Sequence, residues 1–129
     1  MEIIKGRVKK GRGLGKVMGF PTLNMDYEGQ SNGVFAGRVV FSTGDENYGL
    51  KGAVHVGPRP TIDDPKPVCE VFILDFPHEL NDKSFEGIEI ELHLLQKIRE
   101  IEKFPTLDAL TAQIAKDVAE IENLLAERN

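Results

Sequence analysis

The sequence VCEVFILDF, residues 68–76, is apolar on both of the faces that a β-strand presents. A strand of this kind has to be covered by protein on both sides. Glu70 interrupts the apolar run, and counting by two places it on the same face as Phe72 and Leu74. A carboxylate on such a face is costly unless something binds it. Cys69 falls on the opposite face, where we expect a packed thiol.

Downstream, the pattern predicts another strand and then a helix. Residues 88–98, IEIELHLLQKI, alternate between apolar and polar side chains, so Ile88, Ile90, Leu92, Leu94 and Ile98 are expected on one face. From Thr106 the apolar period becomes helical, with one stripe made by Leu107, Leu110, Ile114, Val118, Ile121 and Leu125. Thr106 is the predicted N-cap, and Asp108 in the first turn favours the helix dipole.

Upstream, short strands alternate with turn signals. We predict strands at 2–10 and 22–25, a loop at 26–33, and a hairpin of 34–42 with 48–56 around the turn 43–47. The prolines that follow predict no regular pairing before Val68; they are Pro58, Pro60, Pro65 and Pro67. These patterns predict a mainly β fold, an antiparallel barrel with one amphipathic helix packed outside it.

Length and composition bound the organisation. With 129 residues we expect a single domain over 1–129, with the barrel at about 1–99 and the helix at about 106–127. Cys69 is the only cysteine, which excludes an internal disulfide framework and fits a reducing compartment. We find no signal peptide or membrane-spanning run, so we expect a cytoplasmic protein.

The net charge of −5 is distributed unevenly along the chain. Residues 1–25 carry six Lys and Arg side chains and one acidic one, whereas residues 26–129 carry ten basic and twenty acidic ones. A basic patch confined to one end favours a small anionic ligand over a nucleic-acid backbone, which needs a broad positive surface. We therefore expect neither nucleic acid nor membrane as a partner.

The basic end contains the glycine-rich stretch 11–24, GRGLGKVMGFPTLN. Its glycines allow consecutive N–H groups to turn toward one anion, and its basic side chains add charge; these residues are Gly11, Arg12, Gly13, Gly15, Lys16 and Gly19. Thr22 and Asn24 alternate, so on a strand their oxygens share a face where a hard cation could be held. Taken alone, such glycines also mark ordinary hairpin turns, and Thr22 and Asn24 could bond to turn backbone.

Five blocks of this sequence resemble the riboflavin kinase family. The run 11–24 is similar to the family's glycine-rich lead into G-F-P-T-A-N, with Leu23 in place of alanine. The other four blocks follow in the family's order: Gly33-Val34-Phe35-Ala36, 56–61 resembling N-I-G-x-R-P-T, 70–76 resembling E-V-H-L-L-D-F, and a final block that begins with Arg99 and Lys103-Phe104 and continues from Leu107 to Asp117. The resemblance covers nearly the whole chain.

This resemblance implies a six-stranded Greek-key barrel with a C-terminal helix, and transfer of the ATP γ-phosphoryl group to riboflavin with Mg²⁺ as cofactor. By the same resemblance Gly11, Gly13, Gly15, Lys16, Gly19, Pro21, Thr22 and Asn24 bind nucleotide and phosphate, and Thr22 and Asn24 also hold the metal. Glu70 is then the general base, and its apolar flanks agree, because a raised pKa makes a better base near neutrality. Arg99 and Phe85 are assigned to the flavin side.

Several alternatives stay open at this point. Glu70 could form a structural ion pair with Arg or Lys, and Arg99 could be a solvated strand-end residue. We interpret the three histidines as non-catalytic because they lack metal-ligand spacing; they are His55, His78 and His93. Phenylalanines such as Phe35 and Phe72 could line a ring pocket, although core packing is commoner.

Departures from the family pattern leave room for a second function. The loop before Gly87 reads KSFEG where relatives have D-L-Y-G, and the glutamates in 99–104 are shifted. The alternative function is therefore a non-catalytic flavin or nucleotide sensor. There is no room for an adenylyltransferase module in 129 residues, so the expected product is FMN. The expected partners are riboflavin or FMN and ATP or ADP, bound by a monomer.

Overall fold

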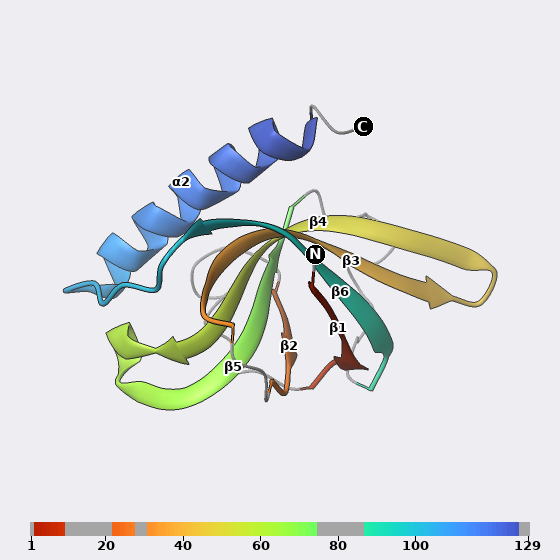
Figure 1. Cartoon of the computed structure of the whole chain (residues 1–129), viewed down its shortest axis with the longest axis horizontal. Coiled ribbons are helices and arrows are strands. Elements are labelled where there is room, and N and C mark those ends of the chain that lie inside the picture. Colours follow the sequence, from red (N-terminus) through yellow and green to blue (C-terminus); the bar gives the residue numbers. More distant parts are fainter. Residues whose placement is uncertain (1, 10–21, 28–30, 75–86, 127–129) are drawn as a thin grey trace.

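The computed structural model describes residues 2–9, 22–27, 31–74 and 87–126. In these residues one antiparallel sheet curls into a half-barrel and a single long helix follows it (Figure 1). The elements are β1 (Glu2–Arg7), β2 (Thr22–Met25), β3 (Gly33–Thr43), β4 (Glu46–Arg59), the 3₁₀ turn η1 (Pro60–Ile62), β5 (Asp64–Ile73), β6 (Glu89–Arg99) and α2 (Leu107–Ala126). The predicted mainly β fold class is confirmed.

The strand order is β1-β6-β3-β4-β5-β2. Strands β3, β4 and β5 are neighbours in sequence and in space, and β6 returns to lie beside β3, which is a Greek-key arrangement. The edge strands meet beyond the end of β1, where the Lys9 N–H donates to the Asn24 carbonyl oxygen of β2 at 2.8 Å. The sheet therefore curls far enough to bring its two ends together.

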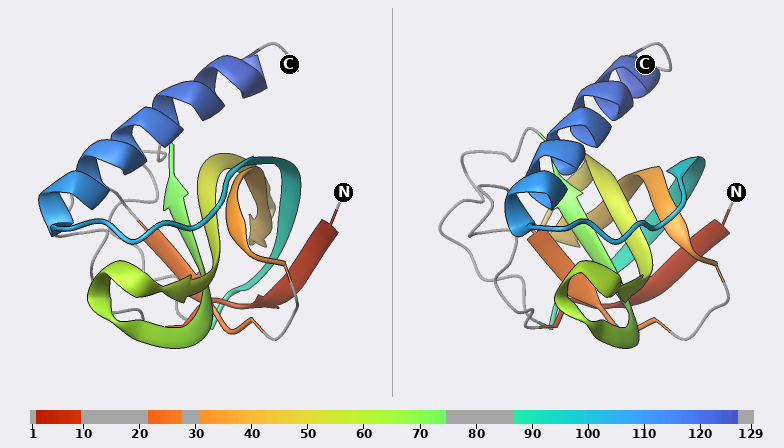
Figure 2. Two further views of the ribbon diagram at one scale, coloured as in Figure 1. Left: turned by 60° about the vertical axis from the view of Figure 1, so that its left-hand side comes forward. Right: turned by 90° about the vertical axis from the view of Figure 1, so that its left-hand side faces the viewer.

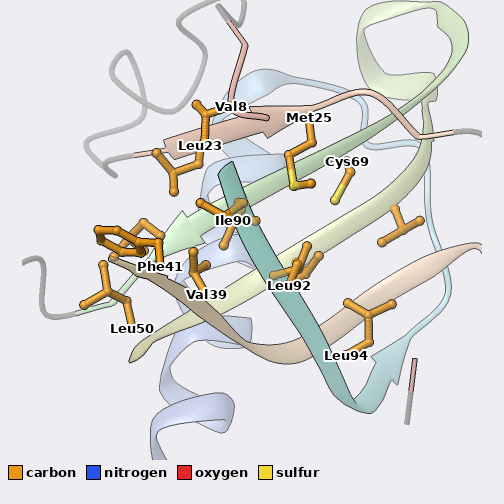
Figure 3. Packing of buried hydrophobic residues seen from close by; sticks show 14 of the residues in the cluster. Val8, Leu23, Met25, Val39, Phe41, Leu50, Cys69, Ile90, Leu92 and Leu94 are labelled. Atoms are coloured by element: carbon orange, nitrogen blue, oxygen red, sulfur yellow. The ribbon is translucent and has the colours of Figure 1, made fainter. Parts of the chain in front are cut away.

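The inside of the curled sheet holds the main hydrophobic cluster (Figure 3). Its strand members come from β2 to β6 and include the fully buried Val39, Val71 and Leu92, while Val8 joins the cluster just after β1 and the partly buried Ile4 of β1 packs against it. Cys69 lies in this cluster, and burial in it raises the pKa of the thiol to about 12. As predicted, Cys69 and Glu70 therefore lie on opposite faces of β5.

The outside of the sheet is covered by α2 (Figure 2). Apolar residues of α2 pack on outward-facing residues of the sheet, and this second cluster comprises Ala36, Ala53, Phe72, Leu74, Ile114, Ile121 and Leu125. The helix is capped as predicted, because the Thr106 hydroxyl accepts a hydrogen bond from the Ala109 N–H at 3.1 Å. Within the described residues, no helix has the length and apolar character needed to cross a membrane.

The prediction that prolines prevent pairing between 58 and 68 was wrong. Strand β4 runs to Arg59, β5 begins at Asp64, and the two are paired there with η1 as their connection. The register shifts between Gly57 and Arg59. Pairing with β3 stops at Val56, and pairing with β2 spans only 69–72. The prolines thus lie where one side of each strand has no partner strand, which a residue without an N–H tolerates.

The predicted apolar faces of β6 and α2 also need correction. Leu94 lies in the inner cluster, whereas Leu95 and Ile98 pack against the outer one. The pairing of β6 with β3 shifts between Ala36 and Gly37, and such an irregularity changes which face the later residues occupy. On α2, Leu107 is 42% exposed, because it begins the helix beyond the part that packs on the sheet.

Candidate functional site

A row of directly opposed residues crosses five strands on the outer face of the sheet. Asn24 of β2 pairs with Glu70 of β5, Glu70 with His55 of β4, His55 with Val34 of β3, and Val34 with Arg99 of β6. Residues opposed in an antiparallel pair share a face and lie about 5 Å apart at Cβ. Residues as far apart in the chain as 24 and 99 are therefore assembled into one site.

Glu70 is the buried carboxylate of this row. It is 3% exposed, and its Oε2 atom has no hydrogen-bond partner among the described residues. Burial raises the pKa of Glu70, and the positive charge of Arg59 opposes that shift. The Glu70 carboxylate is thus buried in the site with one oxygen atom that no described residue binds.

His55 lies between Glu70 and Val34 in the row. Its Nε2–H donates to the Pro58 carbonyl oxygen at 2.8 Å, because a carbonyl can only accept. Burial lowers the pKa of His55, and the charges of Arg59 and Arg99 act in the same direction. The ring is therefore neutral near pH 7, with Nδ1 as an acceptor. The spacing of His55 from the other histidines does not suit a metal site, so the sequence contains no signal for its role, and only strand register reveals its position.

A cavity of about 50 Å³ opens between this row and the N-terminal half of α2. The sheet lines the cavity with Val34, His55, Glu70, Phe72 and, at the end of β6, Arg99. The helix lines it with Leu110, Ile114 and Asp117. The remaining wall is formed by Arg59, Pro60 and Thr61 at the β4–η1 junction and by Ile101, Glu102 and Phe104 between β6 and α2. This volume admits one or two water-sized groups. It suits the end of a substrate, such as a hydroxyl group, better than a complete ring system.

The segment 100–106, which we call the strap, forms one wall of the cavity and joins β6 to α2. The Phe104 N–H donates to Thr61 Oγ1 at 3.0 Å, and Lys103 Nζ lies 3.2 Å from Asp63 Oδ1. Arg99 precedes the strap, and its guanidinium carbon lies 5.6 Å from the centre of the Phe104 ring. These contacts attach the strap to the turn after β4.

The structure places some of the sequence-predicted site residues together. Thr22 and Asn24 lie on the same face of β2, and they pair with Phe72 and Glu70 of β5. Arg99 lines the cavity and is not a solvated strand-end residue, since its side chain is only 15% exposed. Gly11, Gly13, Gly15, Lys16, Gly19, Pro21 and Phe85 lie outside the described residues.

Comparison with known proteins identifies the family. The sequence model of the family described as Flavokinase, riboflavin kinase, matches residues 2–125. This chain belongs to the riboflavin kinase family. It is 38% identical over 122 residues to the RNA-binding riboflavin kinase RibR of Bacillus subtilis, covering 92% of this chain and 49% of that protein. It is 37% identical over 118 residues to the bifunctional riboflavin kinase/FMN adenylyltransferase of Haemophilus influenzae, covering 89% of this chain and 36% of that one.

A solved structure of a riboflavin kinase has a similar fold. The crystal structure of riboflavin kinase from Trypanosoma brucei superimposes with a TM-score of 0.67 and 23% sequence identity, over 96% of this chain and 79% of that one. At this identity the likeness is one of fold. The chain spans about half or less of the length of the curated family members quoted above.

Proposed function

We propose that this chain is a riboflavin kinase, which transfers the γ-phosphoryl group of ATP to the 5′-hydroxyl of riboflavin and forms FMN and ADP. The observation that carries the proposal is the buried carboxylate of Glu70, opposite Asn24 in a chain of this family, whose Oε2 atom has no hydrogen-bond partner among the described residues. Phosphoryl transfer depends on positioning and on stabilising charge, with a base beside the attacking hydroxyl. The outer-face row supplies a candidate for each of these tasks.

Glu70 is the proposed general base. The riboflavin 5′-oxygen forms a bond to the γ-phosphorus, the bond from that phosphorus to the bridging oxygen of ADP breaks, and the hydroxyl proton passes to a Glu70 oxygen. Burial raises the pKa of Glu70, which brings its proton affinity closer to that useful near neutral pH. Its Oε2 atom is not engaged by a described residue and is available to the substrate.

Thr22 and Asn24 are the proposed metal and phosphate ligands. Their side chains offer a hydroxyl and an amide oxygen, which are hard donors that suit Mg²⁺, and both residues are half-buried and pair with Phe72 and Glu70 of β5. Bound Mg²⁺ would offset the negative charge of the phosphates. For the nucleotide phosphates we further propose the glycine-rich stretch with Gly11, Gly13, Gly15, Lys16, Gly19 and Pro21. Arg99 and Phe85 remain the proposed flavin-side residues.

The experiment incubates the protein with riboflavin, ATP and magnesium and measures the FMN formed by chromatography. We compare the wild type with Glu70→Gln and with Glu122→Gln, a control on the exposed face of α2. Loss of a general base is expected to lower turnover at least about a hundredfold, while the control stays like the wild type.

A parallel fluorescence titration with riboflavin separates catalysis from binding. Glu70→Gln should still bind riboflavin, because the substitution keeps the shape of the side chain. Unchanged turnover in Glu70→Gln would exclude Glu70 as the base. Riboflavin binding without FMN formation by the wild type would instead support a flavin sensor on the same fold.

A further inference from the structure

Asp117 interrupts the apolar stripe of α2 with a buried carboxylate. It lies between Ile114 and Ile121 on the face that packs on the sheet, and it is 2% exposed. Removing a carboxylate from water is costly unless it is paired and hydrogen-bonded. The sequence alone gave no partner for this residue.

The partner is Arg99, at the end of β6. Arg99 Nε lies 3.1 Å from both Asp117 oxygens, and Nη2 lies 2.9 Å from Oδ2. Gln113 Nε2 donates to Oδ1 at 3.0 Å, so the carboxylate is well satisfied. Buried ion pairs of this kind can often be replaced by apolar residues of similar volume without loss of stability. Folding alone therefore does not account for a charged pair at this position.

The pair fixes the orientation of the guanidinium group. Arg99 presents its Nε–Nη2 edge to Asp117, and Nη1 donates to the Glu100 carbonyl oxygen at 3.1 Å. A guanidinium has five N–H groups, so two are left without an acceptor among the described residues. Arg99 and Asp117 both line the cavity that contains Glu70. A cation with unused donors is thus held rigidly beside the proposed base.

We infer that Asp117 is a positioning residue: it holds Arg99 so that the remaining N–H groups bind an oxygen atom of riboflavin in the cavity. This inference rests on the proposed function and extends it to α2, which makes no other polar contribution to the cavity among the described residues. Arg99 is the residue that contacts the substrate, and Asp117 acts through it. A fixed fork selects an acceptor by geometry as well as by charge.

The test removes both charges together, in Arg99→Met/Asp117→Leu, so that no buried charge is left without a partner. We expect this variant to keep the thermal midpoint of the wild type within a few degrees. Its dissociation constant and KM for riboflavin should rise about ten- to a hundredfold, the effect of losing a hydrogen bond from a charged group, with a smaller change in kcat. The control is Lys5→Met/Glu91→Gln, which removes an exposed ion pair on β1 and β6, away from the cavity.

A second variant covers the case in which the double variant does not fold. Arg99→Lys keeps the charge opposite Asp117 but loses the planar fork. We therefore expect it to fold, and to bind riboflavin more weakly than the wild type does. Lumiflavin, which lacks the ribityl chain, shows which part of riboflavin carries the acceptor. If Arg99→Lys binds lumiflavin more weakly than the wild type does, the acceptor is on the ring. If the two proteins bind lumiflavin equally, the acceptor is on the ribityl chain.

The outcomes separate the two proposals. Wild-type affinity and KM in a folded Arg99→Met/Asp117→Leu or in Arg99→Lys would make the pair purely structural and overturn this inference alone. If the wild type itself neither binds riboflavin nor forms FMN, the proposed function fails and the inference with it.

Discussion

Glu70 makes the stability of the fold depend on pH. Burial raises its pKa above the ordinary value of 4.5, so the folded chain retains a proton that the unfolded chain releases. The wild type should therefore lose stability as the pH rises from 4.5 toward the raised value. Glu70→Gln cannot titrate, and its unfolding free energy relative to the wild type is expected to increase over that range.

Urea denaturation at a series of pH values measures this difference, with Glu122→Gln as the control on α2. A difference between Glu70→Gln and the wild type that stays constant from pH 4 to pH 8 would contradict the prediction. Only the change of this difference with pH tests the prediction. A pH-independent offset added to it is expected in either direction, because the neutral amide carries its own burial cost at every pH.

His55 should make the stability of the fold fall as the pH is lowered, whereas Glu70 makes it fall as the pH is raised. Burial lowers its pKa below the ordinary value of 6.5, helped by Arg59 and Arg99 and opposed by hydrogen bonds to backbone carbonyls. As the pH falls below 6.5, the unfolded chain binds a proton that the folded chain resists, so the wild type loses stability. His55→Asn should lose less stability than the wild type between pH 6.5 and pH 5. His93→Asn, on the polar face of β6, is the control, and equal acid sensitivity of His55→Asn and the wild type would refute the prediction.

At the scale of the element, the close packing of β6 and Val54 around β3 depends on the missing side chain of Gly37. A Cβ added there would lie 2.8 Å from Val54 Cγ2 and 2.9 Å from the His93 carbonyl oxygen, which belongs to the backbone of β6. Gly37→Ala should therefore cost about 1–3 kcal/mol of unfolding free energy. Gly49→Ala, in the same hairpin, meets nothing within 4 Å and should cost nothing. Equal stabilities of the two variants in urea denaturation would show that the strands can separate to accept the methyl group.

Two threonines at the N-terminal end of α2, Thr106 before the helix and Thr111 within it, provide a second matched pair. The Thr106 hydroxyl caps the helix, whereas Thr111 Oγ1 donates to the Leu107 carbonyl oxygen within it at 2.8 Å. Thr106→Ala should cost about 1 kcal/mol, because the Ala109 N–H loses its acceptor. Thr111→Ala should leave stability unchanged or slightly raised, since alanine is the better helix former. Denaturation midpoints compared at constant m-value measure both, and no loss in Thr106→Ala would contradict the assigned cap.

At the scale of the molecule, ligand binding is coupled to folding. A ligand that binds only the folded chain adds about 2.7 kcal/mol of stability at one hundred times its dissociation constant. ATP with magnesium and riboflavin should each raise the thermal midpoint. In Asn24→Ala the shift with ATP and magnesium should be reduced and the shift with riboflavin retained. Chelation with EDTA is the matching control for the metal, and an unchanged ATP shift in Asn24→Ala would remove Asn24 from the proposed ligands.

Local pattern was enough to predict the element types and the fold class. Alternation predicted the strands, and a run apolar on both faces predicted that β5 is covered on both sides. The helical stripe predicted α2. These features depend on side chains a few residues apart, whose relative directions follow from backbone geometry alone. The same reasoning failed where the backbone departs from regular pairing, at the β6 register shift and at the prolines.

The site was decided by tertiary structure. Sequence identified Glu70, Thr22, Asn24 and Arg99 as candidates, but it could not show that His55 and Arg99 lie in one row with Asn24 and Glu70 or that Asp117 pairs with Arg99. Periodicity specifies the face on which a side chain lies, and it contains no information about which strand is the neighbour or in what register. Those depend on the closure of a sheet between residues far apart in the chain, and only the folded molecule determines it.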